Sequence, residues 1–521
     1  MEKPRYKVKA GSVPHLPKVA SVDSAFKVPG SVNPSFEAAG RGRRLRNFNP
    51  PKRHINSAIQ AAGATLVARA RWLYENDGYA GNAVDEWAST AVGDGVKPRP
   101  KKSVPKAQKA ALLDLFWDWT EEADADGMSD YYGLQEKAAR EVFLAGEVFF
   151  RIRARRPGDM WTVPFQLQLL PSEMLDLNFN EVTPTGNIIR AGIEFDAIGR
   201  RVAYHFWRWH PYDDVPLGKS GTRERVPVPA SEVIHVIEGR QAGQIRGVPR
   251  VARVLVKIFK MEAYDDAELE RKGTAALFAG FIVGRGEVPL DDLNDDDDDE
   301  APIAPMEPGA LVDLGDDKDI RFSTPADVGG SYDPFQYRNI LKISSGLGVP
   351  YSYVSGDMTK GNFSNVRTDI VRFRRRVGQW TNNTLIFQMC RVVWKEFVER
   401  AYMAGLVDLP GYDENPTRYW AAEHLPPRHE WIDPAKDVAA EKDAIKAGLK
   451  SRTQAVAERG YDREELDEEI AEERAEEDRL GLEFDTRTPA TAPAAGFGGS
   501  ASGAEEDQDQ QDEETDVPEN A

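Results

Sequence analysis

No proline occurs between Pro350 and Pro410, and apolar residues recur at every third to fifth position through most of that stretch. The recurrence starts at Phe363 and continues to Phe397. Such spacing keeps one side of an α-helix apolar, so it predicts a single helix of about 40 residues, about 60 Å long. The whole chain has 521 residues, which is too many for one core, so we expect about two to four domains or lobes.

The segment before this helix reads GLGVPYSYVSGDMTKGNFSNVR, from Gly346 to Arg367. A helix predicted over residues 333–346 ends at its Gly-Leu-Gly, and Pro350 prevents an immediate restart. Small polar residues follow, with Lys360 next to Gly361. The sequence therefore predicts a flexible, glycine-bounded loop between two helices, which is either a surface linker or a segment with a function of its own.

The charge of the chain is distributed in blocks. The formal net charge is −19, but residues 462–521 alone hold 22 acidic and 4 basic residues. The first 53 residues hold 12 Lys and Arg against 3 acidic residues. Such blocks are usually solvated tails, and the alternative is a docking surface for a protein or a nucleic acid.

Helical and strand-like patterns alternate along the rest of the chain. Helices are predicted from a cap at Asn56 and over 80–92, 106–122 and 130–146. Short strand-like runs follow up to residue 239, and a helix begins near Pro249 and ends at Gly273. Short strands at about 275–284 and 310–322 enclose an acidic run. Amphipathic helices broken at Gly448 and Gly460 precede a tail without order-forming content.

Motifs for common chemistries are incomplete. The Gly-Lys-Ser at 218–220 lacks the first glycine and the strand of a phosphate-binding loop, and the acidic run 122–127 lacks two ligands of a calcium loop. A proline pair between His424 and His429 breaks the helix that a zinc motif needs. We therefore predict no catalytic residue, no metal and no cofactor. The single cysteine, Cys390, excludes an internal disulfide and fits a reducing cytoplasm, and no apolar stretch is long enough to span a membrane.

Two groups of side chains leave alternatives open. Seven tryptophans could stack on bases, but their apolar surroundings favour burial or subunit contact: Trp72, Trp117, Trp119, Trp207, Trp209, Trp380 and Trp394. The predicted long helix carries a basic face that could meet DNA phosphates or pair with acids of a neighbouring subunit. Its members are Arg367, Arg372, Arg374, Arg375 and Arg376.

Six segments in collinear order resemble one family. They are NPP at Asn49–Pro51, NDGYAGNAVDEWASTAVGDGVKPRP, AAREVFLAGEVFFR, GQIRGVPRVARVLVKI, GLGVPYSYVSGDMTKGNFSNVR and WIDPAKDVAAEKDAIKAGL. Together they span roughly residues 45–460 and resemble the lambda-type phage portal proteins. Each segment alone is weak, whereas the six in this order are specific. We match no motif of the family to the acidic insert 291–300 or to the tail.

The resemblance implies an α+β portal fold. Its parts would be a basic arm (1–50), a wing of helices and strands (51–247), a stem helix (248–272), a small α/β clip with an acidic loop (273–332), a second stem helix (333–349), a channel loop (350–362), a long wing helix with its connection (363–433), a helical crown (434–484) and an acidic tail (485–521).

The resemblance also implies a function. The chain would be a non-enzymatic subunit of a closed ring of about twelve copies at one capsid vertex, found in the virion and, during assembly, in the host cytoplasm. The ring would pass double-stranded DNA in both directions without sequence preference. It would dock terminase, major capsid or scaffold proteins and neck proteins, and would have no membrane partner.

In this interpretation the loop between the two helices projects into the channel and contacts DNA weakly. The candidate residues are Ser355, Gly356, Asp357, Met358, Thr359, Lys360, Gly361 and Asn362. The two glycines would supply backbone freedom, and a single lysine per subunit would hold a moving duplex loosely. The rival functions are a phage nuclease or packaging ATPase, and a minor head or scaffold protein.

Overall fold

The computed structural model describes residues 43, 46–156, 159, 162–213, 224–276, 280–284, 318–322, 332–426, 433–459 and 461–482. The chain divides into two compact units, Met1–Pro434 and Ala435–Ala521. The acidic insert 291–300 and the tail after residue 485 lie outside the described residues, so their assignment as a clip loop and an acidic tail stays a prediction.

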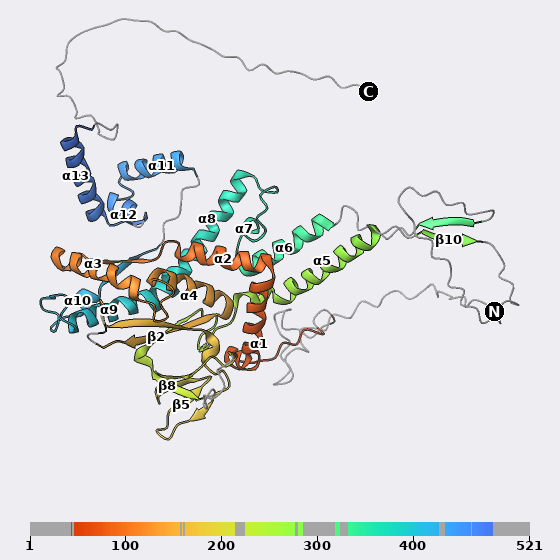
Figure 1. The fold of residues 1–521 in the computed structure, drawn as a ribbon, viewed down its shortest axis with the longest axis horizontal. Helices are drawn as coiled ribbons and strands as arrows, with labels where there is room; N and C mark the ends of the chain where they lie inside the picture. The colour runs from red at the N-terminus through yellow and green to blue at the C-terminus, as the bar shows by residue number, and fades with distance from the viewer. Residues whose placement is uncertain are drawn as a thin grey trace, which may run out of the picture. The chain divides into compact units, whose positions relative to one another are not determined.

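The first unit opens with helices close to the predicted positions (Figure 1). They are α1 Ile55–Asn76, α2 Gly78–Val92, α3 Lys106–Glu122 and α4 Tyr131–Ala145. The prediction that Asn56 caps α1 is wrong. The side chain of His54 is the cap and accepts the hydrogen bond from the Asn56 N–H. The Asn56 side chain is engaged in a tertiary contact instead, which is described below with the junction.

Antiparallel strands follow α4 and form two sheets. In the three-stranded sheet β2 lies between the others, and its members are β3 Phe165–Leu170, β2 Glu147–Ala154 and β9 Val233–Ile237. The five-stranded sheet consists, in order, of β4 Glu181–Val182, β5 Ile188–Arg190, β6 Ile193–Phe195, β7 Arg201–Trp207 and β8 Arg225–Pro229. A further pair, β1 Lys97–Pro100 and β12 Ala422–Leu425, joins segments far apart in the chain.

The first half of strand β2, residues 147–150, is buried on both faces and separates two apolar clusters. Phe150 and Ile152 belong to the large cluster, which also includes side chains from α1 to α4 and from the long helix described below. Phe149 belongs to the smaller cluster with Tyr204 and Phe206 of β7. Successive side chains of a strand point to opposite faces, so a strand between two clusters has to be apolar on both sides.

The tryptophans divide into two groups. Trp119, Trp380 and Trp394 are buried, in agreement with the sequence, and Trp207 is half-buried. Trp72, Trp117 and Trp209 are 49%, 58% and 40% exposed, so burial in the core of the chain is wrong for them, and contact with another subunit stays a prediction.

Helices α5 Leu255–Ala276 and α6 Tyr332–Leu347 form an antiparallel pair (Figure 1). Val254, just before α5, contacts Gly346 near the end of α6, where an added Cβ would lie 2.2 Å from the valine Cγ1. At the other end the Lys272 ammonium lies 5.1 Å from the centre of the Tyr332 ring. The chain between the two helices includes the antiparallel hairpin of β10 Gly280–Gly284 and β11 Lys318–Phe322.

Two predicted features of α5 are wrong. Pro249 precedes a separate 3-10 turn, η6 Arg250–Arg253, instead of starting the α-helix itself. Gly273 does not end the helix, which continues to Ala276. Gly273 has open space around it, and an exposed helix interior tolerates a glycine at a cost of about 1 kcal/mol.

The predicted long helix is present from Phe363 to Met403. It consists of α8 Phe363–Trp380, a π-helical stretch η8 Thr381–Cys390 and α9 Arg391–Met403. From Phe373 to Phe397 its apolar stripe is buried in the large cluster. The π-helical stretch was not predicted. Such stretches are rare and commonly occur at functional positions. A short helix, α10 Thr417–Trp420, and β12 complete the first unit.

The second unit contains α11 Pro434–Lys446, α12 Arg452–Ala457 and α13 Arg463–Leu480. The predicted break at Gly448 is confirmed, because this glycine has a left-handed φ of 71°. Ser451 and Gln454 form a capping box at the start of α12. Across the described residues, no helix combines the length and apolarity needed to cross a bilayer.

Candidate nucleic-acid interface and the junction behind it

The predicted channel loop is shorter than expected, because its first residues are helical. Tyr351–Ser355 form α7, with Pro350 immediately before it. Proline fits a helix start, where its missing N–H is not needed, so Pro350 does not block a restart as the sequence suggested. Val354 is buried and its carbonyl accepts a 3.3 Å hydrogen bond from the side chain of Asn82. The irregular loop therefore spans residues 356–362.

Both glycines of this loop have defined structural roles. Gly356 ends α7 with a left-handed φ of 70°, which a residue with a Cβ adopts only at a cost. A Cβ at Gly361 would lie 2.5 Å from Cγ2 of Val366. Asn362 caps α8 by accepting the Asn365 N–H at 2.9 Å. The glycines therefore fix the backbone at the two ends of the loop, whereas the sequence predicted that they supply backbone freedom.

Asp357 organises the interior of the loop. Its carboxylate accepts hydrogen bonds from the N–H of Thr359 at 2.8 Å and from its hydroxyl at 2.5 Å. The Tyr351 hydroxyl donates to the same carboxylate at 2.9 Å. These bonds lower the pKa of Asp357, while burial and the bond to Asp357 raise the pKa of Tyr351 to about 12. The remaining side chains, Met358, Thr359 and Lys360, are exposed.

Lys360 is paired with a residue of α6. Its Nζ donates to the two carboxylate oxygens of Asp333 at 2.8 and 2.6 Å, and lies 4.7 Å from the centre of the Tyr337 ring. The sequence held no signal for this contact. Asp333 belongs to the first turn of α6, so the loop folds back against the helix that precedes it.

The five predicted arginines do not share one face of α8. At about 100° per residue, Arg372, Arg375 and Arg376 lie on one side, and all three are exposed. Arg367 and Arg374 lie on the opposite side and are half-buried. The guanidinium of Arg376 donates to the carbonyl of Gly348 at 3.2 Å, and that of Arg372 lies 4.0 Å from the Asp369 carboxylate. The prediction of one basic face is therefore wrong.

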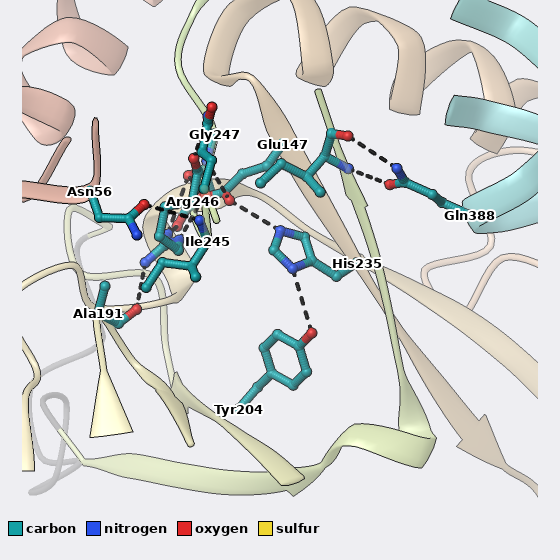
Figure 2. Close-up of polar contacts among 12 residues, drawn as sticks. Asn56, Glu147, Ala191, Tyr204, His235, Ile245, Arg246, Gly247 and Gln388 are labelled. Atoms are coloured by element: carbon teal, nitrogen blue, oxygen red, sulfur yellow. Dashed lines mark hydrogen bonds and ion pairs between the residues drawn. The ribbon is translucent and has the colours of Figure 1, made fainter. Parts of the chain in front are cut away.

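Two of the six segments that carry the resemblance meet where the chain passes from β9 to α5 (Figure 2). The carboxylate of Glu147, the first residue of β2, accepts from Arg246 Nε at 2.8 Å and from the Gly247 N–H at 2.7 Å. It also accepts from Ser172 Oγ at 2.7 Å and lies 3.1 Å from Nε2 of His235. The side chains of Glu147 and Arg246 are each only 1% exposed. This is a buried ion pair with nearly all of its hydrogen-bonding groups satisfied.

The backbones of these two segments touch at Gly146 and Gly247. Gly146 has a φ of 82°, and a Cβ there would lie 2.1 Å from the backbone nitrogen of Val248. A Cβ on Gly247 would lie 2.4 Å from the carbonyl carbon of Gly146. Only glycine permits such an approach from both sides.

We call residues 237–247 the junction segment, because they connect the sheet to the turn before α5. Asn56 of α1 accepts from the N–H of Ile245 at 3.0 Å and donates to the carbonyl of Gly243 at 2.9 Å. Gln388 of η8 accepts from the N–H of Ile237 at 2.7 Å and donates to its carbonyl at 3.2 Å. The junction segment is thus held by α1, by β2 and by the π-helical stretch (Figure 2).

Burial and the surrounding polar groups together set the ionisation of the junction. Burial alone would raise the pKa of Glu147, but the charge of Arg246 together with the hydrogen bonds of His235 and Ser172 outweighs it and lowers that pKa to about 2. Burial lowers the pKa of His235, and its Nδ1 lies 3.4 Å from the hydroxyl of Tyr204. The imidazole is therefore neutral at pH 7, while Glu147 and Arg246 are charged.

We predict that acid destabilises the chain through His235. Below a pH of about 6.5 the unfolded imidazole binds a proton that the folded one does not. The free energy of unfolding should therefore fall as the pH drops from about 7 to about 5. It should fall further below about 4.5, because the carboxyl of Glu147 then binds a proton in the unfolded chain but not yet in the folded one. Urea unfolding of the wild type and of His235→Gln across this range measures the effect. If both curves fall in parallel above pH 5, His235 is not the cause.

The sequence contains one signal for this junction. Glu147 directly precedes the apolar residues Val148, Phe149 and Phe150, and a buried carboxylate requires a cationic partner. Arg246, within Arg-Gly-Val-Pro, was available. Pattern alone could not connect the two, because 99 positions separate them.

Comparisons with known proteins give the same family as the six sequence segments. The profile of the family described as "Phage portal protein, lambda family" matches residues 41–381. This chain belongs to that family. The resemblance seen in the sequence, and with it the function of a phage portal protein, is confirmed. A portal protein is a component of the virion, at the capsid vertex.

Individual relatives are distant. The probable portal protein of Halomonas phage phiHAP-1 is 26% identical over 444 residues, which cover 80% of this chain and 81% of that one. Portal protein B of Escherichia phage lambda is 22% identical and covers 90% of this chain and 93% of that one. A chain from the neck of a native gene transfer agent particle, solved with C12 symmetry, gives a TM-score of 0.43 at 14% identity, with 78% of this chain and 92% of that chain covered.

Portal proteins are structural proteins. Among the described residues, no three His, Cys, Asp or Glu side chains lie close enough together to hold a metal ion. The mixed helix and sheet composition predicted from the sequence is confirmed.

Proposed function

We propose that this portal protein assembles into a closed ring of about twelve copies whose axial channel passes double-stranded DNA during packaging and ejection. The observation that carries the proposal is the exposed loop 356–362, which is bounded by the left-handed Gly356 and by Asn362, the cap of α8, and which bears Lys360. The proposed subunit has no catalytic role. Its partners are terminase, capsid or scaffold proteins and neck proteins, and it assembles in the host cytoplasm.

The arrangement of helices supports the proposed assignment of the parts. The antiparallel pair α5 and α6, with the hairpin of β10 and β11 between them, fits a stem that carries a clip. The structure before this pair, together with α8, η8 and α9, fits a wing, and α11 to α13 fit a crown. The loop 356–362 lies between α6 and α8, where a channel loop is expected.

The chemistry of the loop suits a moving duplex. Hydroxyl and ammonium groups contact phosphate oxygens regardless of base sequence. One lysine per subunit supplies a weak contact that is repeated around the ring and screened by salt. Asp357 is occupied by Thr359 and Tyr351, which leaves Lys360 as the principal charged contact of the loop.

We predict that Lys360→Ala leaves folding and ring assembly intact but reduces DNA retention. An exposed ion pair contributes about 1 kcal/mol or less to stability, so the subunit should fold normally. The loss of one cation per subunit should weaken retention, most clearly at low salt. Nuclease protection of DNA in packaged particles, measured over a range of salt concentrations, tests this, and negative-stain microscopy tests for rings with an axial hole.

Lys97→Ala is the matched control for that experiment. Lys97 is also an exposed lysine beside an aspartate, since its Nζ lies 3.6 Å from Asp94, but it belongs to β1, outside the loop. This variant should retain DNA as the wild type does. Equal retention by Lys360→Ala and the wild type at every salt concentration would make the loop a plain linker. Monomers or filaments in place of rings would favour a minor head or scaffold protein.

A further inference from the structure

We infer that Asp333 is a positioning residue that holds the Lys360 ammonium against α6 and competes with DNA phosphates for it. The inference rests on the proposed channel role of the loop. Asp333 restrains the ammonium of Lys360, which is the proposed DNA contact of the loop. Lys360 therefore binds a DNA phosphate only when it leaves Asp333.

The contact is specific in its geometry. Both carboxylate oxygens of Asp333 lie within 2.8 Å of the ammonium, in the manner of two phosphate oxygens. The Tyr337 ring covers the same ammonium at 4.7 Å. That ring packs edge-to-face on the ring of Tyr351, with 4.9 Å between the two ring centres. The hydroxyl of Tyr351 donates to Asp357 inside the loop. The loop and α6 are therefore linked by a continuous series of contacts.

The contact is also weak enough to exchange. The side chains of Asp333 and Lys360 are 74% and 35% exposed, so water and salt screen their attraction. A phosphate that approaches the loop meets an ammonium that is already neutralised, and it has to displace a carboxylate to bind. This exchange shortens the lifetime of each contact between Lys360 and a phosphate, which favours sliding of the duplex through the channel.

Removal of the carboxylate should release the lysine. In Asp333→Asn the shape of the side chain is kept and its charge is lost. Acylation of the Lys360 amine by a small amine-reactive ester, followed by mass spectrometry of the full-length chain, should proceed about two- to fivefold faster than in the wild type, the range expected for the loss of an exposed ion pair. Asp94→Asn, which removes the partner of Lys97 and changes the net charge equally, should not alter labelling of Lys360.

The same variants test the effect on DNA. Particles with Asp333→Asn should retain about two- to fivefold more nuclease-protected DNA than the wild type under conditions in which the wild type loses most of it, and Asp94→Asn should have no effect. In the double variant Asp333→Asn/Lys360→Ala the gain should vanish, because Asp333 acts through Lys360.

The two readouts separate the restraint from the channel role. Unchanged labelling of Lys360 in Asp333→Asn overturns the restraint. A gain in DNA retention that persists without Lys360 also overturns it. Faster labelling combined with unaltered retention in both Asp333→Asn and Lys360→Ala supports the restraint but rejects the channel role and the competition with phosphate.

Discussion

Glu147→Gln is expected to destabilise the chain by about 3–5 kcal/mol, because it leaves the guanidinium of Arg246 buried without a counter-charge. The substitution keeps the size of the side chain but turns one of its oxygens into a donor. Arg246, Ser172 and the Gly247 N–H all donate toward that carboxylate, so the new amide meets donors where it needs acceptors. A loss of this size is a large part of the stability of an ordinary domain.

Chemical denaturation of the purified full-length chain measures this effect, and Glu173→Gln is the matched control. Glu173 also pairs with an arginine, Arg71, but Arg71 has a second carboxylate partner in Glu141. The control should therefore cost much less, about 1 kcal/mol. If the free energy of unfolding of Glu147→Gln lies within about 1 kcal/mol of the wild type, the buried ion pair of Glu147 and Arg246 does not hold the junction as we infer.

Gly146→Ala is expected to have the second large effect, on the order of 3 kcal/mol or more. The new Cβ would lie 2.1 Å from the backbone nitrogen of Val248, and no rotation of a side chain can relieve a clash with backbone. The two backbone segments would have to separate, and Glu147 would then lose its contact with the Gly247 N–H. We expect the start of α5 to shift with the junction segment, so ring assembly should fail along with stability.

Gly199→Ala separates the steric effect from backbone strain. Gly199 has nearly the same conformation, with a φ of 80°, but nothing lies within 4 Å of a Cβ built there. Its substitution should cost only the strain of a left-handed alanine, about 1 kcal/mol. Thermal or denaturant unfolding of the two variants gives the comparison. Equal losses in the two variants would mean that the close approach of the two backbones contributes nothing.

The sequence by itself determined the local structure and the family. The spacing of apolar residues predicted α3, α4 and the long helix nearly to the residue, because helical periodicity depends only on neighbours along the chain. Proline and glycine marked most of the breaks between elements for the same reason. The order of six short segments was enough to predict the portal family, although each of them is weak alone.

Only the tertiary structure decided how the candidate interface is held. Asn56 could have capped α1, but its amide is used by the junction segment, far away in the sequence. Gly146 has a local role as the left-handed cap of α4, but its close approach to Gly247 follows from no local rule. Lys360, which stands alone in its loop in the sequence, is neutralised by Asp333 of another helix. Hydrogen bonds, ion pairs and close backbone contacts between distant residues leave no periodic trace in a sequence, so they become visible only once the chain is folded.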